Sequence, residues 1–301
     1  MRYFDLHCDT IGECSNNNLS LKNNSLHISL ARAEKISEYT QVFAVWIPDE
    51  LRGKAAEKYF DKTADYFNKE IEKNKELISL YGSDENTPVK AILSVEGGSA
   101  CGGTIEGLYH LYKKGVRLIT LTWNAPNEIA CGAFSKGGFT EFGKEFVRTS
   151  EELGITLDVS HLNRQSFYEF AEISKKPFIA SHSNANIVDN EFAKKRNLDD
   201  EQIRIIKNRN GLIGLNFCRD FIDSENFQGV DALYEQIKYM LSLGCEDTLA
   251  FGSDFDGCTI HKDLSGIEKM PDVYMALKDR GMDETILEKI FWKNAERFFL
   301  K

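Results

Sequence analysis

The sequence predicts an α/β fold of the (β/α)8 TIM-barrel type. Short apolar runs rich in β-branched and aromatic residues recur along the chain, and each is followed by a longer segment with helical periodicity. Eight such pairs are present, and barrels of this type commonly use roughly 250 residues or more for eight units around one core. The chain has 301 residues and no low-complexity linker. We therefore expect one barrel domain spanning residues 1–301.

The expected strands follow one another at intervals that leave room for a helix between them. In chain order they are YFDLHC (3–8), QVFAVWI (41–47), VKAILSV (89–95), RLITLTW (117–123), TLDVS (156–160), PFIAS (177–181), GLIGLNF (211–217) and TLAFGS (248–253). Several are almost wholly apolar, as expected for parallel strands that are covered on both faces. Residues 54–75 illustrate the helices, because apolar side chains recur there at helical spacing among charges. The Asn-rich segment 16–24 is expected to be a solvated loop.

An open, doubly wound sheet is the alternative arrangement of the same units. That fold commonly carries a G-x-G-x-x-G sequence after its first strand, where the glycines let the backbone approach a dinucleotide. The chain has no such sequence, and it has no G-x-x-x-x-G-K-S/T sequence for binding nucleotide phosphates. The closed barrel is therefore favoured.

Composition limits the partners that the protein can have. Lys and Arg number 37 against 47 Asp and Glu, which gives a net charge of −10. This acidic balance argues against nucleic acid and against anionic membranes, because both are bound through basic patches. The sequence has no apolar stretch of about 18 residues and no signal-peptide pattern at its start, so we expect a cytoplasmic location. The seven cysteines form no C-x-x-C pair and are expected to be reduced thiols.

Polar residues stand where several of the expected strands end. In a barrel the active site forms at the carboxyl ends of the strands, so these residues should meet. Three of the six histidines of the chain are among them. The residues are His7, Asp9, Glu96, His161, His182 and Asp254.

This set of side chains predicts a metal centre. Each histidine alone would be interpreted as a core residue with a hydrogen-bond partner, but three imidazoles and three carboxylates are too many buried polar groups to leave unpaired. Two divalent cations would balance them. His7 and Asp9 can hold one cation and the two later histidines the other, and a carboxylate such as Glu96 can bridge the two. Asp254 is then free to transfer protons. Imidazole and carboxylate ligands suit zinc, with manganese or iron as alternatives.

The same residues lie in segments that resemble the membrane (renal-type) dipeptidases, the family M19 metallopeptidases of the amidohydrolase-like metal-dependent hydrolase barrels. The resemblance extends over nearly the whole chain. The matching segments are DLHCDT (5–10), SVEGG (94–98), GVRLITLTWN (115–124), DVSH (158–161), SHSNA (181–185), RN (196–197), GLIGLNF (211–217), GSDFDG (252–257) and NAERFF (294–299).

The resemblance implies a dipeptidase with two zinc ions per chain. His7, Asp9 and the bridging Glu96 would hold one ion, and Glu96, His161 and His182 the other. A water that bridges the ions would attack the peptide bond, with Asp254 as the acid/base. Arg196 would grip the C-terminal carboxylate of the dipeptide, a task that suits a planar and permanently charged guanidinium.

One residue departs from the family pattern. Many members carry a histidine after Leu-Thr at the end of the fourth expected strand, where it contacts the substrate carbonyl, whereas this chain has Trp123. The indole offers one N–H donor and no charge, which bears on how the oxyanion is stabilised.

The expected substrate is a small dipeptide with a free C-terminal carboxylate, of L,L or also L,D configuration. Another amidohydrolase activity on the same barrel, that of an amidase, lactonase or phosphotriesterase-like enzyme, is the alternative. A metal-binding module without activity would require the loss of a catalytic group, and the set is complete. The sequence leaves open whether the protein is a monomer or a homodimer.

Overall fold

Eight parallel strands close into a barrel in the computed structural model, which describes residues 1–300. Around the barrel they follow chain order, and pairing of β2 with both β1 and β4 closes the ring. Each strand overlaps one of the eight predicted runs, and the predicted (β/α)8 fold is confirmed. The strands are β1 (Arg2–Cys8), β2 (Glu38–Trp46), β4 (Val89–Glu96), β5 (Val116–Thr120), β6 (Thr156–Asp158), β7 (Ile179–Ala180), β8 (Leu212–Leu215) and β9 (Leu249–Phe251).

A ninth strand, which the sequence pattern does not predict, lies outside the ring. It is β3 (Ile78–Leu80), and it pairs with the first residues of β4 from Val89 onward. The next barrel strand, β5, joins β4 only from Leu93. The early part of β4 is therefore free to accept β3, and a segment of three residues is too short to show a periodic pattern.

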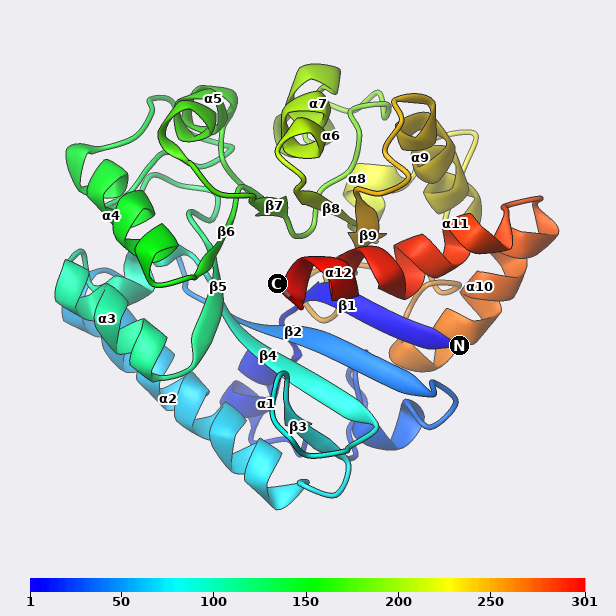
Figure 1. The fold of residues 1–301 in the computed structure, drawn as a ribbon, viewed down its shortest axis with the longest axis horizontal. Helices are drawn as coiled ribbons and strands as arrows, with labels where there is room; N and C mark the ends of the chain where they lie inside the picture. Colours follow the sequence, from blue (N-terminus) through cyan, green and yellow to red (C-terminus); the bar gives the residue numbers. More distant parts are fainter. Residues whose placement is uncertain (301) are drawn as a thin grey trace.

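Helices surround the strands, as Figure 1 shows for α2, α3, α4 and α5 on one side and α7, α9 and α10 on the other. Among residues 1–300, none of the helices combines the length and the apolar character needed to cross a membrane. Their bounds are α1 (Thr10–Asn17), α2 (Gly53–Lys73), α3 (Ile105–Lys113), α4 (Glu141–Glu152), α5 (Arg164–Ile173), α6 (Ala193–Arg196), α7 (Asp200–Asn208), α8 (Arg219–Ile222), α9 (Val230–Ser242), α10 (Met270–Asp279), α11 (Glu284–Glu288) and α12 (Asn294–Phe299). Short 3₁₀ turns cover Leu30–Arg32, Gly98–Cys101 and Ile267–Lys269, and a π-helical segment covers Lys289–Lys293.

The inside of the barrel is filled by apolar side chains rather than by solvent. One buried side chain or more from each of seven strands meets there, including Phe4, Val42 and Leu118. Trp292 and Ala295, from the C-terminal helical segments, pack against the same cluster. Figure 1 shows α12 crossing the centre of the ring of strands. The barrel therefore has a closed floor, and a site can form only at its other end, where the strands finish.

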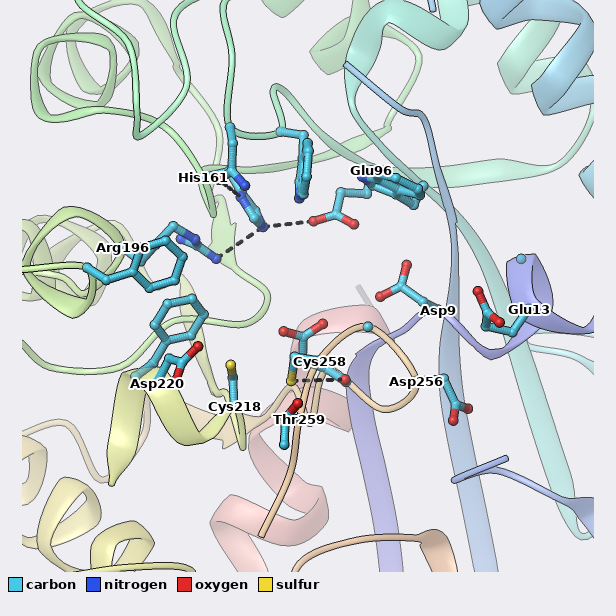
Figure 2. A pocket seen from close by; sticks show the side chains of 18 of the residues that line it. Asp9, Glu13, Glu96, His161, Arg196, Cys218, Asp220, Asp256, Cys258 and Thr259 are labelled. Atoms are coloured by element: carbon cyan, nitrogen blue, oxygen red, sulfur yellow. Dashed lines mark hydrogen bonds and ion pairs between the residues drawn. The ribbon is translucent and has the colours of Figure 1, made fainter. Parts of the chain in front are cut away.

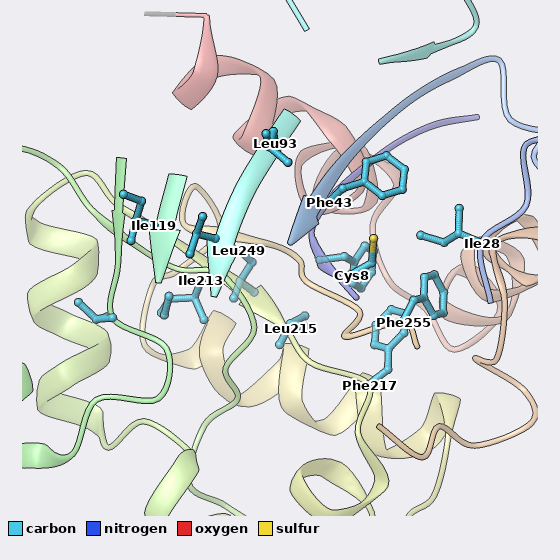
Figure 3. Packing of buried hydrophobic residues seen from close by; sticks show 14 of the residues in the cluster. Cys8, Ile28, Phe43, Leu93, Ile119, Ile213, Leu215, Phe217, Leu249 and Phe255 are labelled. Atoms are coloured by element: carbon cyan, nitrogen blue, oxygen red, sulfur yellow. The ribbon is translucent and has the colours of Figure 1, made fainter. Parts of the chain in front are cut away.

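A second and larger core lies between the strands and the outer helices. Figure 3 shows Cys8 of β1 among Phe43, Phe217 and Phe255 in this layer. The rings of Phe217 and Phe255 meet edge to face with their centroids 5.8 Å apart. This packing anchors the ends of β1, β8 and β9, from which residues of the candidate site extend.

Candidate active site and metal centre

The six polar residues predicted to meet at the strand ends do lie together. His7 and Glu96 belong to the last residues of β1 and β4, and Asp9 is the N-cap residue of α1. His161, His182 and Asp254 follow shortly after β6, β7 and β9. All are buried except Asp9, which is partly exposed.

A β-bulge at the end of β1 aims His7 into the barrel. Asp5 pairs with Gln41 and Cys8 with Phe43, so three steps along β1 match two along β2. The extra residue reverses the alternation of side chains, so Cys8 packs in the outer core and His7 faces the site. The sequence argument placed His7 and Asp9 on one face of a strand. Their convergence instead comes from this bulge and from the turn into α1.

A buried carboxylate stabilises the bulge. Oδ1 of Asp5 accepts hydrogen bonds from the backbone N–H of His7, at 3.2 Å, and of Ser253, at 2.9 Å. It therefore ties the end of β1 to the residue that precedes Asp254. Burial raises the pKa of Asp5 to about 6.

Glu96 faces both histidine groups with different oxygen atoms. Its Oε1 atom lies 2.8 Å from Nε2 of His161 and 3.3 Å from Nε2 of His182. Its Oε2 atom lies 3.7 Å from Nε2 of His7. Figure 2 shows Glu96 extending toward His161. One carboxylate is thus shared between two sets of ligands.

Two further carboxylates lie near His7. Nε2 of His7 lies 3.3 Å from Oδ2 of Asp9 and 3.8 Å from Oδ1 of Asp254. Burial alone would lower the pKa of His7, but the charges of Glu96, Asp9 and Asp254 raise it to about 10. Burial raises the pKa of Glu96 well above its usual range. Three carboxylates around one imidazole leave a surplus of buried negative charge, which a cation would neutralise.

The second set is held in a fixed tautomer. Nδ1 of His161 lies 3.0 Å from Oδ1 of Asn124, and this oxygen can only accept a hydrogen bond. Nδ1 of His182 contacts the hydroxyl of Ser181 at 2.7 Å, and that hydroxyl donates to Asp158. Both Nδ1 atoms therefore carry the proton, which leaves both Nε2 atoms with a lone pair toward the site.

The two free Nε2 atoms lie only 2.8 Å apart. Burial lowers the pKa of both rings well below the usual value of histidine, and the positive charges of Arg196 and His7 act in the same direction. Two facing lone pairs at this distance repel one another unless an electrophile lies near both. The donors therefore fit a divalent cation of the zinc type, which takes neutral imidazole and carboxylate ligands.

Two groups of three potential ligands satisfy the spacing of a metal site. They are His7, Glu96 and His182, and His7, Asp9 and Asp254, with ligand atoms within 4.8 Å of one another in each group. Oδ1 of Asp9 is buried and has no hydrogen-bond partner among residues 1–300. An unpaired carboxylate oxygen at this point is available for a further bond to a cation.

Two site residues adopt a left-handed backbone that is uncommon for residues other than glycine. His161 has φ of 70° and Asp254 has φ of 61°. Such conformations cost roughly 1 to 3 kcal/mol each and persist where the surroundings fix them, which is common at functional sites. Beyond the turn at Asp254 lies Gly257, and a Cβ atom there would overlap the carboxylates of both Asp9 and Asp254.

Several supporting residues were not singled out from the sequence. Asp158 accepts hydrogen bonds from the backbone N–H groups of Ser160 and Ser181 and from the hydroxyl of Thr120, so it joins β5, β6 and β7. Asn216 donates from Nδ2 to Oδ2 of Asp254 at 3.0 Å. A buried aspartate at the end of an apolar strand was a signal that could have identified Asp158.

Arg196 also reaches the site. It ends the short helix α6, its side chain is buried, and its Nη2 atom lies 3.1 Å from Nε2 of His161. Its guanidinium lies 5.2 Å from the centroid of the Phe221 ring. Figure 2 shows it pointing toward His161 from the side opposite Asp9.

The candidate site opens into a cavity of about 410 Å³. Trp123 forms part of its wall and packs edge to face against Trp46, with centroids 5.0 Å apart. Trp46 ends β2 and was not identified from the sequence, because an aromatic residue at a strand end is more often a core residue. The lining consists of Asp9, Gly12, Glu13, Asn16, Trp46, Tyr59, Glu96, Trp123, Asn124, His161, Phe192, Arg196, Cys218, Asp220, Phe221, Asp254, Asp256, Gly257, Cys258 and Thr259.

Comparison with known proteins gives one consistent family. The model of the family described as membrane dipeptidase (peptidase family M19) matches residues 1–301. An uncharacterized protein in the pqqA 5′ region of Klebsiella pneumoniae is 29% identical over 70% of this chain and 81% of its own length. An uncharacterized dipeptidase of Schizosaccharomyces pombe is also 29% identical, over 69% of this chain and 52% of its own length.

Solved structures show the same fold. The dipeptidase AC, a metallopeptidase of family M19, superposes with a TM-score of 0.90 at 25% identity, covering 98% of this chain and 96% of the other. A metallopeptidase from Rhodobacter sphaeroides, solved with a phosphinate mimic of the dipeptide L-Ala-D-Ala, has a TM-score of 0.89 at 23% identity, with 98% and 97% covered.

Proposed function

The chain belongs to the membrane dipeptidase family, peptidase family M19, and on this basis we propose that it is a binuclear zinc dipeptidase. Family and neighbours support a metallodipeptidase. The proposal adds the number and identity of the ions, the residues that act and the substrate. The substrate is a dipeptide with a free C-terminal carboxylate.

The observation that carries the proposal is the position of Glu96 between two sets of ligands. Its two oxygens face His7 on one side and the pair His161 and His182 on the other. We assign His7, Asp9 and Glu96 to one zinc ion, and Glu96, His161 and His182 to the other. When bound, two such ions polarise the scissile carbonyl and lower the pKa of a water molecule.

We assign the proton transfers to Asp254. Asn216 holds one of its oxygens, Oδ2, and the other lies near His7 on the cavity side. Asp254 would accept a proton from the attacking water and deliver it to the departing amine.

We assign recognition of the C-terminal carboxylate to Arg196. A buried guanidinium that faces the cavity and has no carboxylate within ion-pair distance among residues 1–300 can accept an anion from the substrate. In this role, Arg196 would hold the carboxylate of the substrate at the His161 end of the ligand cluster, because its Nη2 atom lies 3.1 Å from Nε2 of His161. Trp123, on the cavity wall, would contact the middle of the dipeptide.

A substrate series tests the proposal directly. We would measure kcat/KM for L,L and L,D dipeptides, and for the same dipeptides with an amidated C-terminus, on zinc-loaded protein whose metal content is determined on the same sample. The L,D series is included because a neighbour of the same fold binds a mimic of L-Ala-D-Ala. We expect hydrolysis of free dipeptides and poor hydrolysis of the amides. Equal rates would instead indicate a general amidase on the same barrel.

A further inference from the structure

The cavity is electrically asymmetric. Among the described residues that line it, Arg196 is the one permanently charged cation, and six carboxylates face it. Asp9, Glu96 and Asp254 belong to the proposed metal and proton-transfer groups. Asp256 accepts hydrogen bonds from the backbone N–H of His27 and from the hydroxyl of Thr10, so it joins the turn after β9 to α1 and to the segment at His27. Two carboxylates, Glu13 and Asp220, remain without such a role.

These two carboxylates lie at opposite ends of the cavity. Asp220 is on α8 next to Phe221, whose ring contacts Arg196. Glu13 is in the first turn of α1, four residues after Asp9. Figure 2 shows Glu13 beside Asp9, across the cavity from Arg196. Glu13 therefore lies at the end of the cavity that is farther from the carboxylate clamp.

The surroundings of Glu13 form a polar wall. Asn16, one turn further along α1, donates from Nδ2 to the hydroxyl of Tyr59 at 3.1 Å. Both residues line the cavity with Glu13. Gly12 lines it too and has no side chain to fill the space beside them. The segment 16–24 was expected to be a solvated loop, whereas its first residues belong to α1 and Asn16 reaches the cavity.

The carboxylate of Glu13 is hydrogen-bonded at the protein surface and not inside the cavity. Its Oε2 atom accepts a hydrogen bond from Nδ2 of Asn17 at 3.2 Å, at the surface, and no Lys or Arg forms an ion pair with it among residues 1–300. Nζ of Lys62 donates a hydrogen bond to Oδ1 of Asn16 at 3.4 Å, but Lys62 does not line the cavity. The negative charge of Glu13 is therefore available to a ligand in the cavity.

The orientation of the substrate follows from the proposed function, on which this inference rests. If Arg196 holds the C-terminal carboxylate, the N-terminal residue of the dipeptide extends toward Asp9 and Glu13. We propose that Glu13, with Asn16 and Tyr59, forms the pocket for the N-terminal side chain and selects dipeptides that begin with lysine or arginine. A cationic side chain there gains a charge-assisted hydrogen bond that a neutral side chain of equal length lacks.

The test compares Lys-Ala with norleucyl-alanine, since norleucine has the same carbon chain without the ammonium group. We expect kcat/KM of the natural enzyme to favour Lys-Ala about tenfold, the low end for a hydrogen bond to a charged group. In Glu13→Gln this ratio should fall close to one. Glu106→Gln, which alters an exposed first-turn glutamate of α3, is the matched control and should keep the ratio.

Reversing the charge of residue 13 gives a second, independent test. In Glu13→Lys the preference should move to Glu-Ala over norleucyl-alanine. If Glu13→Gln instead lowers kcat/KM equally for Lys-Ala and norleucyl-alanine, the residue binds the α-ammonium group common to both, and the proposed selectivity is wrong. Equal hydrolysis of both dipeptides by the natural enzyme also overturns the selectivity but leaves the dipeptidase proposal intact. Failure to cleave either dipeptide in both its L,L and its L,D form overturns the dipeptidase proposal itself.

Discussion

The imidazoles of His161 and His182 face one another with their Nε2 atoms 2.8 Å apart, while Asn124 and Ser181 hold the Nδ1 atoms behind them. The protein therefore places two lone pairs together and fixes the tautomers that expose them. In a buried site this arrangement is unfavourable until a cation lies between the ligands. The fold thus organises the site before the metal binds.

We predict about two divalent ions per chain after zinc reconstitution. His161→Ala should remove mainly one of them, because the other has His7, Asp9 and Glu96 as ligands. Elemental analysis of dialysed samples gives the stoichiometry. The prediction would be wrong if the natural protein consistently retained no more than one tightly bound ion. Removing the ions with a chelator should also lower the midpoint temperature of unfolding, since the ions bind the folded state.

Asp254→Asn should leave the metal content near that of the natural protein and lower kcat by on the order of 10²-fold or more, as the loss of a general acid/base does. Measuring kcat and metal content on the same samples separates a loss of proton transfer from a loss of metal. Asp256 is unsuitable as a control because Thr10 and the backbone of His27 bind it. Asp220→Asn is the better comparison, since this carboxylate lines the cavity and is exposed. If Asp254→Asn kept the kcat of the natural protein, Asp254 would not be the acid/base.

Gly257→Ala should weaken metal binding, because the added Cβ would overlap the carboxylates of Asp9 and Asp254 and force at least one of them to move. We expect reduced metal content after dialysis and a loss of activity that excess zinc partly restores. Gly12→Ala is the control for metal content, since a Cβ at that helical position meets nothing within 4 Å. Its activity is not compared, because Gly12 lines the cavity beside Glu13. Full metal retention in Gly257→Ala would show that the Asp9 carboxylate is not held as a ligand.

The sequence predicted the barrel well because its strands are buried on both faces and therefore read as distinct apolar runs. It could not predict the β-bulge of β1, because a bulge depends on how Cys8 pairs with Phe43 in another strand. For the same reason β3 was missed, since its three residues form a strand only through pairing with β4.

The candidate site could be predicted as a set of polar residues at strand ends, and the structure brings those residues together. Their roles remain proposals. The sequence did not identify Asp158, Asn216 or Gly257, because their contribution depends on which backbone groups and carboxylates they meet in three dimensions. Such supporting residues have no spacing pattern of their own, whereas the ligands occur in short motifs.

Arg196→Ala should raise KM for free dipeptides strongly. The expected loss of binding free energy is roughly 2 to 5 kcal/mol, as when one partner of a buried charge pair is removed. Amidated dipeptides lack this charge, so their KM should change little in the variant. Comparing KM for the two substrate forms in both proteins measures the coupling between Arg196 and the carboxylate. An equal loss for free and amidated dipeptides would show that Arg196 acts by positioning His161, 3.1 Å away, rather than by binding the substrate.

Trp123→His should raise kcat on dipeptides if a missing imidazole limits stabilisation of the oxyanion. One well-placed donor to the oxyanion is worth about 10²- to 10³-fold in kcat. The indole of Trp123 packs edge to face against Trp46, so a smaller side chain also opens space in the cavity wall, and we expect it to lower the midpoint temperature of unfolding. Trp123→Phe separates the two effects, because it keeps an aromatic ring and removes the N–H donor. We expect Trp123→His to be faster than Trp123→Phe at equal metal content. If both variants lost activity in proportion to their loss of stability, Trp123 would be a packing residue of the cavity wall, and the oxyanion would depend on the metal ligands and their cations alone.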